Sequence, residues 1–247
     1  MKKNRDSTRA KTTSLTVLLV SVFLLSALAG AQFVGKVSAA WPYDWPMFHH
    51  DLQHTGYSTS PAPSTNQTLW NYTTGSFIAS SPVVADGKVY IGSYDRKFYC
   101  LDAATGAHIW NFTTGGTVGS SPAVVDGRVY VGSDDDNIYC LDAASGALLW
   151  NYTTGGDAVS CPAVSDGRVY VGSKWDFLYC LNASTGAYIW SYLTGSDVLS
   201  SPAIADGRVY IGSYDNQLYC LNATNGWVMW IFPTSGWVWS SPAVADG

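Results

Sequence analysis

The sequence predicts an all-β chain made of repeated four-stranded antiparallel units, and three patterns lead to that prediction. The chain repeats itself every 40 residues without insertion or deletion, and a Ser-Ser-Pro or Ser-Cys-Pro triplet marks the repeat at residues 80–82, 120–122, 160–162, 200–202 and 240–242. An Asp-Gly dipeptide follows each of the first four triplets, at Asp86, Asp126, Asp166 and Asp206. The apolar residues do not follow the i, i+3, i+4 spacing of a helix.

Each unit offers four short β-rich runs. In the second unit they are Val118–Val125, Arg128–Gly132, Asn137–Asp142 and Ala147–Thr153. The Asp-Gly dipeptide between the first two runs predicts a type I′ hairpin, because both central residues of that turn need a positive φ. Four antiparallel strands in a unit of this length are typical of a propeller blade. We therefore expect a β-propeller of four-stranded antiparallel blades, with 40-residue repeats.

The third and fourth runs resemble a known motif. Residues 100–110 read Cys-Leu-Asp-Ala-Ala-Thr-Gly-Ala-His-Ile-Trp, and similar text recurs at 140–150, 180–190 and 220–230. It resembles the tryptophan-docking motif, Ala-x-Asp-x-x-Thr-Gly-x-x-x-Trp, of the PQQ-like (quinoprotein-type) repeat family. That resemblance implies that the tryptophans stack on the neighbouring blade, and it gives a structural docking role to Trp70, Trp110, Trp150, Trp190, Trp230, Gly106, Gly146, Gly186 and Gly226. A WD-repeat propeller is the alternative, but Trp-Asp occurs once, at Trp175, and out of register.

The chain departs from this motif at its first position, where Cys replaces Ala. Neighbouring sheets lie ~10 Å apart, whereas a disulfide needs Cα atoms within about 7 Å. Cys also replaces Ala tolerably in a packed site. We therefore expect free structural thiols at Cys100, Cys140, Cys180 and Cys220, and Cys161 makes the count odd.

The repeat also sets the expected domain boundaries. Residues 1–40 combine an early basic stretch, an apolar run and small residues before Trp41, and they predict a signal peptide or, alternatively, an uncleaved N-terminal anchor. Residues 41–67 are a lead-in segment, and 68–247 are the PQQ-like propeller. Within the propeller we expect an outer strand at 68–75, blades at 76–115, 116–155, 156–195 and 196–235, and a partial blade at 236–247. The propeller thus looks truncated, with four full blades plus partial ones.

Charge excludes one class of partner. After Ala40 lie 7 of the 13 basic and 17 of the 18 acidic residues, so this part has a formal charge of −10. Without a basic patch, binding to a phosphate backbone has no electrostatic support. We expect no nucleic-acid partner, and membrane contact only through the N-terminal segment if it is uncleaved. Asn-x-Ser/Thr sequons, which suggest a glycoprotein in an exported chain, occur at Asn66, Asn71, Asn111, Asn151, Asn182 and Asn222.

Catalytic chemistry has little support. The resemblance implies that quinone-dependent dehydrogenases of this type use a vicinal Cys-Cys pair, a Glu/Asn/Asp set around Ca²⁺ and a Trp beneath the quinone. This chain has no Cys-Cys and no Glu. We therefore expect no catalytic residue and no cofactor, and this expectation includes pyrroloquinoline quinone (PQQ) despite the family name.

Two clusters are weak candidates for a metal site. His49, His50, Asp51 and His54 suit Zn or Cu by ligand type. The favoured interpretation is structural, because the stretch from Trp45 to Gly56 resembles the lead-in segment that often precedes these repeats. Asp134, Asp135 and Asp136 offer oxygen ligands for Ca²⁺, but a solvated acidic turn is the favoured interpretation.

Variation between the blades indicates a binding face. The connections between blades and the turns between second and third strands vary, and alternate connections of an antiparallel blade lie on the same face. Aromatic and acidic residues on a rigid scaffold can form a binding surface, although the sequence of loop tips can also vary without any function. The candidates are Phe77, Tyr94, Asp95, Arg96, Asp134, Asp135, Asp136, Asp157, Lys174, Trp175, Asp176, Asp197, Tyr214, Asp215, Trp237 and Trp239.

These features lead to a functional hypothesis. We expect a non-catalytic, exported propeller on the cell surface that acts as a binding or scaffold module for a protein, peptide or glycan. It resembles in fold the outer-membrane protein assembly scaffold lipoprotein and archaeal surface propellers, although no Cys precedes Cys100 to serve as a lipidation site. The alternatives are a sensor or adhesion domain of a larger surface protein and, less favoured, a PQQ-dependent dehydrogenase-like enzyme.

Overall fold

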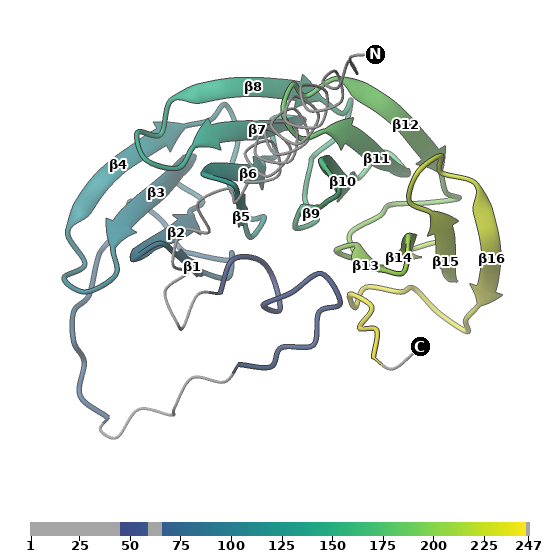
Figure 1. Cartoon of the computed structure of the whole chain (residues 1–247), viewed down its shortest axis with the longest axis horizontal. Coiled ribbons are helices and arrows are strands. Elements are labelled where there is room, and N and C mark those ends of the chain that lie inside the picture. The colour runs from purple at the N-terminus through teal and green to yellow at the C-terminus, as the bar shows by residue number, and fades with distance from the viewer. Residues whose placement is uncertain (1–44, 59–65, 246–247) are drawn as a thin grey trace, which may run out of the picture. The chain divides into compact units, whose positions relative to one another are not determined.

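Four antiparallel four-stranded sheets stand side by side along an arc (Figure 1). The computed structural model describes residues 45–58 and 66–245, and the predicted signal or anchor at 1–40 lies outside these ranges. No helix occurs in the described residues, and none there has the length and hydropathy that a membrane span requires. The prediction of an all-β fold made of four-stranded blades is confirmed.

The strands follow one another in sequence order within each blade. Blade one contains β1 (Val83–Ala85), β2 (Lys88–Gly92), β3 (Lys97–Asp102) and β4 (His108–Thr113). Blade two contains β5 (Ala123–Val125), β6 (Arg128–Gly132), β7 (Asn137–Asp142) and β8 (Leu148–Thr153). Blade three contains β9 (Ala163–Ser165), β10 (Arg168–Gly172), β11 (Phe177–Asn182) and β12 (Tyr188–Leu193). Blade four contains β13 (Ala203–Ala205), β14 (Arg208–Ser213), β15 (Gln217–Asn222) and β16 (Val228–Pro233).

The repeated turns explain why the strands end where they do. Asp126 and Gly127 have φ angles of 51° and 71°, which is the left-handed geometry of a type I′ hairpin. Between the third and fourth strands, the Asp142 carboxylate accepts hydrogen bonds from the amides of Ala144 and Ser145 and from the Ser145 hydroxyl. This Asp-led turn competes well with a continued strand, and it sets the start of β8.

The two segments predicted as strands at the ends of the repeat lie unpaired among the described residues, so these predictions stay open. Residues 68–75 and 236–245 have no ladder partner among the described residues. A strand is defined by hydrogen bonds to a neighbour, so the β-rich sequence of these segments alone does not suffice. Side chains and one amide hold the segment 68–75: the Trp70 indole nitrogen donates to the carbonyl oxygen of Ala103 at 3.0 Å, and the Gly75 amide donates to the Asp95 carboxylate at 2.7 Å.

The cores lie between neighbouring sheets. One cluster joins blades one and two, and it contains Tyr90, Phe98 and Trp110 from the first and Val129 and Leu141 from the second. Clusters built from the equivalent repeat positions lie between blades two and three and between blades three and four. Blades two and three therefore bury both of their faces against neighbours, and blades one and four bury one face each in these clusters, in the manner of stacked layers.

The tryptophans of the repeat lie at these junctions. The Trp110 indole nitrogen donates to the carbonyl oxygen of Ala143 at 3.3 Å, and its ring lies on Gly146. Gly146 has a φ of 73°, and a Cβ there would come within 2.6 Å of the ring. Only glycine meets both conditions. The pairs Trp70–Gly106, Trp150–Gly186 and Trp190–Gly226 repeat this close contact.

A tyrosine in the second strand adds a second bond to the same acceptor. Tyr90 donates from its hydroxyl to Ala143 O at 3.1 Å, so this carbonyl accepts from both Tyr90 and Trp110. Tyr130 and Tyr170 do the same at the next two junctions, on Ala183 and Ala223. The sequence analysis missed this role, although a Tyr at the same place in all four units was a readable signal.

All five cysteines are free, and the four in the third strands are buried. Each of these pairs in register with a Tyr of the second strand and a Trp of the fourth, such as Cys140 with Tyr130 and Trp150. Burial raises the pKa of Cys100, Cys140 and Cys180 to about 12. These thiols are therefore neutral core residues at physiological pH.

Candidate functional site

The constant turns and the variable connections lie at opposite ends of the strands. The amide of Ala143 donates to the carbonyl of Gly127, which joins the two constant turns of blade two. At the other end, the amide of Asp134 donates to the carbonyl of Thr117, which joins the turn after the second strand to the loop before the first. We call this variable end the loop face.

Each blade presents one pair of residues on the loop face. The second member of each pair donates its amide to the carbonyl of the first, across a gap of 17 residues in sequence. We call them the paired positions: Phe77 with Tyr94, Thr117 with Asp134, Asp157 with Lys174, and Asp197 with Tyr214.

The same backbone position carries a different chemistry in each blade. Phe77 and Tyr94 hold their rings 4.5 Å apart. Thr117 donates its hydroxyl to the Asp134 carboxylate. Lys174 forms a salt bridge of 2.6 Å with Asp157. The backbone is thus constant while the side chains vary, which is how a repeat scaffold displays a recognition surface.

Three aspartates that the sequence suggested for binding are hydrogen-bonded within the protein. Each lies in the turn after the second strand and binds the loop that leads into its blade, and we call this contact the joint. The Asp135 carboxylate accepts from the Gly115 amide at 2.6 Å and from the Tyr139 hydroxyl at 2.7 Å. Asp95 and Asp215 make the same two bonds in blades one and four. Burial opposes the charge of Asp95 and Asp135, but the bonds from the tyrosine and the glycine amide outweigh it, so the pKa of each is lowered.

Blade three departs from this joint. Trp175 stands where the other blades have Asp, and the Tyr179 hydroxyl donates to the carbonyl of Thr154 at 2.5 Å instead. The indole remains 65% exposed while it lies on Gly155 and Gly156. A Cβ at Gly156 would come within 2.3 Å of the indole ring. The loop is therefore shaped to hold an exposed indole on the loop face.

Arg96, Asp136 and Asp176 occupy the next position of the same turn. Their φ angles are 67°, 66° and 66°, in the left-handed region. The carbonyl of Asp136 accepts from the amide and the hydroxyl of Thr154, so this residue also closes the turn. Their backbones thus serve the turn while their side chains vary between blades.

Charges on the loop face interact across blades two, three and four. The hydrogen bond to Asp157 raises the pKa of Lys174, and the carboxylates of Asp134 and Asp197 add to the effect. Burial and the nearby charge of Asp176 raise the pKa of Asp197, although Lys174 opposes them. The positively charged Lys174 side chain therefore lies among several carboxylates, of which Asp157 is its salt-bridge partner.

Aromatic side chains gather beside this group. The Tyr214 ring stacks on Trp237 with centroids 5.0 Å apart and an angle of 1°, and Trp239 lies 5.7 Å from Tyr214. Trp237 and Trp239 are both exposed. Flat exposed rings of this kind suit peptide side chains or sugar rings.

The histidine cluster lies elsewhere. Asp51 accepts from the amide and the hydroxyl of Thr55, so it caps a turn. His54 is buried, with its Nδ1 3.0 Å from the carbonyl oxygen of Pro242, while His49 is exposed. Burial lowers the pKa of His54. Within residues 45–58 and 66–245, no three His, Cys, Asp or Glu side chains are placed to hold a metal ion.

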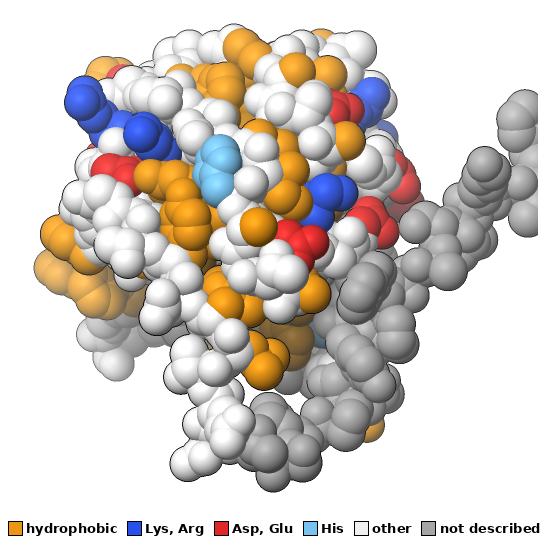
Figure 2. Space-filling view, turned by 90° about the vertical axis from the view of Figure 1, so that its left-hand side faces the viewer, with side chains coloured by type: hydrophobic (Ala, Val, Ile, Leu, Met, Phe, Trp, Pro, Cys, Tyr) orange, Lys and Arg blue, Asp and Glu red, His pale blue; other side chains and the backbone are white. Residues whose placement is uncertain are grey.

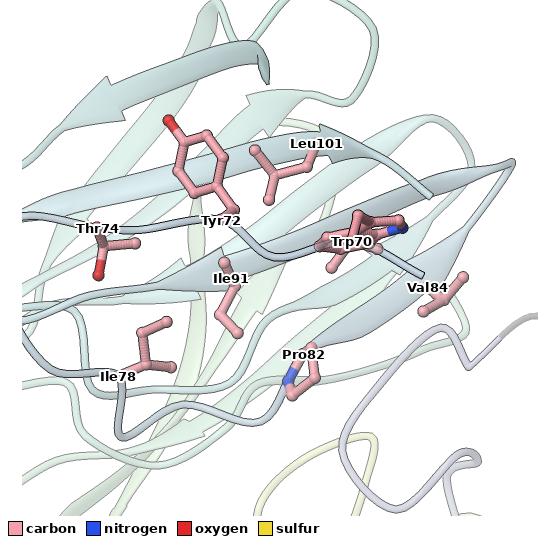
Figure 3. Close-up of a pocket in the computed structure, with 9 residues that line it drawn as sticks. Trp70, Tyr72, Thr74, Ile78, Pro82, Val84, Ile91 and Leu101 are labelled. Carbon is pink, nitrogen blue, oxygen red and sulfur yellow. The ribbon is translucent and has the colours of Figure 1, made fainter. Parts of the chain in front are cut away.

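A cavity of about 320 Å³ lies on blade one, between its sheet and the segment 68–75 (Figure 3). Its lining is apolar and includes Trp70, Val84, Val89, Ile91 and Leu101. The corresponding residues of blade two, Val124, Val129, Val131 and Leu141, are buried against blade one. The cavity is therefore a blade junction that is only partly filled.

On the side of the molecule shown in Figure 2, acidic and basic side chains are scattered among hydrophobic ones.

Comparisons with known proteins agree with the propeller fold. The sequence matches the family described as outer membrane protein assembly factor BamB over residues 59–162 and 155–246. The chain belongs to this PQQ-like propeller family. Among curated proteins, no sequence matches it significantly.

Solved structures show the same architecture. BamB from Moraxella catarrhalis matches with 25% identity and a TM-score of 0.63, over 70% of this chain and 57% of that one. A quinohemoprotein alcohol dehydrogenase from Comamonas testosteroni matches with 19% identity and a TM-score of 0.69, over 78% of this chain and 41% of that one. The computationally designed Ika8 protein matches with 18% identity and a TM-score of 0.59, over 64% and 50%. The chain thus spans less than two thirds of the length of each.

The described residues do not fit the quinone of the dehydrogenases. The carboxylates of Asp95, Asp135 and Asp215 each already accept hydrogen bonds from a glycine amide and a tyrosine hydroxyl of this chain. The exposed indole of Trp175 lies on a glycine pair rather than over an open site. The cysteines of the third strands are buried within separate sheets.

Proposed function

We propose that this chain is a non-catalytic binding or scaffold module, exported to the cell surface, which holds a protein, peptide or glycan on its loop face. The paired positions carry this proposal, because one constant backbone bond per blade displays a different pair of side chains. The exposed rings of Trp175, Trp237 and Trp239 add contact area of the kind that anchors a partner.

The family supports the binding interpretation. The matching family is described as an assembly factor, and a solved BamB has the same fold. The basic start of the sequence and its apolar run support export. The dehydrogenase relatives share the fold at 19% identity, and a shared fold does not transfer activity.

Photo-cross-linking tests the proposal. A photoreactive amino acid is placed at Lys174 on the loop face or, as the matched control, at Asp166, which is exposed on a constant turn. Each purified protein is irradiated with the envelope fraction of the producing cells. We expect a discrete adduct from position 174 and none from position 166, and digestion of the adduct by protease or glycosidase separates a protein from a glycan. No adduct at 174, or equal adducts at both positions, contradicts the proposal.

A further inference from the structure

Residues 45–54 run along the innermost strands of the propeller. We call them the channel segment. Figure 1 shows this part of the chain beside β1 and β13, and the backbone bonds agree. The amide of Val84 donates to the carbonyl of Trp45 at 3.0 Å, and that of Val124 donates to Pro46 at 2.7 Å. The amide of Ile204 donates to Leu52 at 2.7 Å.

The inner strands need this partner for a simple geometric reason. Val84, Val124 and Ile204 are the central residues of three-residue strands, and each faces a residue of the second strand without exchanging hydrogen bonds with it. Their amides therefore point away from the sheet, toward the centre of the arc. An open strand edge of this kind is a ready template for another chain.

The channel segment binds these edges through two pairs of consecutive residues. The carbonyls of Trp45 and Pro46 serve blades one and two, and those of Leu52 and Gln53 serve blade four and the segment after it, at Val244. Two further bonds return from the channel segment, from the Trp45 amide to Val84 O and from the Gln53 side chain to Ile204 O. Consecutive carbonyls thus reach consecutive inner strands.

Side chains of the channel segment complete the fit. Met47 is buried in the core cluster that contains Val164 and Val169, so blade three is contacted by a side chain. Leu52 packs against the clusters on both sides of blade three. Anchoring by backbone bonds with alternate side chains in pockets is the logic of β-strand addition.

We propose that the centre of the propeller is a peptide-binding site, and that the channel segment is its built-in ligand. This site is separate from the loop face and does not depend on the proposed function. It recognises an extended chain through paired backbone carbonyls, one medium-sized apolar side chain at the position of Met47, and a side-chain amide at that of Gln53.

Exchange of the segment in trans tests the proposal. A protease site is inserted between Ser58 and Asn66 of the full chain, which is then cleaved after folding. We expect the N-terminal piece to co-elute with the propeller, and a fluorescent peptide of residues 41–58 to replace it, seen as a rise in anisotropy. A peptide with Met47→Ala should compete more than about tenfold less well, since a buried Met→Ala change costs about 2–5 kcal/mol. The matched peptide with His49→Ala, at an exposed position, should compete like the wild type.

A second measurement keeps the test decisive if cleavage unfolds the propeller. In the uncut chain, Met47→Ala should speed amide hydrogen exchange in β1, β5 and β13 more than in β3 and β7, and His49→Ala should not. Release of the cleaved piece without uptake of the labelled peptide, from a propeller whose circular dichroism is unchanged, overturns the proposal. Unchanged exchange in the Met47→Ala chain also overturns it.

Discussion

The junctions between blades and the loop face use the same repeat in opposite ways. At the junctions, each blade repeats one set of contacts, in which a Trp and a Tyr donate to one carbonyl beside a glycine, as Trp150 and Tyr130 do with Ala183. On the loop face, the backbone bond repeats but the side chains do not, as Lys174 and Tyr214 show. The comparison teaches that contacts repeated in every blade stabilise the fold, while side chains that vary at a repeated backbone position indicate where a partner can bind.

Asp135 shows where this comparison needs care. It lies on the loop face, yet it repeats in three blades and is bonded within the joint. Position on a face therefore does not by itself separate the two roles. The predictions below test the separation, from the largest expected effect to the smallest.

Removing a junction tryptophan should cost most. Trp150→Ala deletes a buried ring that fills the junction and donates to Ala183 O. We expect a loss of about 3–5 kcal/mol in the free energy of unfolding, measured with urea. Trp230→Ala is the matched control, because Trp230 is 42% exposed, and its loss should be clearly smaller. Equal losses would show that the ring contributes little through the junction.

Removing a joint aspartate should come next. Asp135→Ala leaves the Gly115 amide and the Tyr139 hydroxyl without their acceptor. We expect a loss of about 1–3 kcal/mol in the same urea assay, since partly buried donors lose their partner. Asp134→Ala removes a neighbouring carboxylate that is bonded only to Thr117 in the described structure, and it should cost less.

The same joints should make the fold acid-sensitive. The pKa values of Asp95 and Asp135 are lower in the folded chain than the usual value of about 3.9. Their stabilisation is therefore complete above about pH 5 and is lost as the pH falls through about 4 and below. Urea unfolding between about pH 3 and 7 should show this slope, and Asp95→Asn with Asp135→Asn should flatten it. An equal slope in the double variant would assign the acid sensitivity to other groups.

Removing one of two donors to a carbonyl should cost less again. Tyr130→Phe keeps the ring in the core, and Ala183 O still accepts from Trp150. We expect about 1 kcal/mol, the net value of one buried hydrogen bond. Tyr210→Phe is the control, because Tyr210 lies at the open end and no such bond to a following blade occurs in the described residues.

The paired positions should matter least for stability. Lys174→Ala breaks a salt bridge whose side chains are 42% and 29% exposed, and we expect a change within about 1 kcal/mol. The same variant should weaken the loop-face adduct that is captured through a photoreactive group at Tyr214. A large stability loss with unchanged capture would place Lys174 with the structural residues.

Much of the fold could be predicted from the sequence, because its turns depend on local residues. Asp126-Gly127 predicted a hairpin from φ preferences alone, and the structure has it. The role of Asp135 could not be read from its own turn, since its partner amide, Gly115, lies 20 residues earlier. A closer comparison of units would have helped, because the position that carries Asp in three blades carries Trp175 in the other.

The channel segment could not be predicted at all. Its bonds use main-chain carbonyls, which every residue has, so Trp45, Pro46 and Leu52 carry no side-chain signature of the strands that they meet. The outer strand expected at 68–75 and the partial blade expected at 236–247 stay predictions, because a strand needs a neighbour to pair with and none lies beside residues 68–75 and 236–245 in the described part of the chain.

Each 40-residue unit carries both the donors for the next junction and the carbonyl and glycine that receive the previous one. A duplicated unit would therefore arrive with compatible surfaces on both sides, and the propeller could grow by copying without inventing a new contact. The channel segment limits that freedom. Its dipeptides span neighbouring inner strands, so an extra unit between blades one and two would separate the amides that Trp45 and Pro46 now reach together, and the segment works as a gauge of blade spacing.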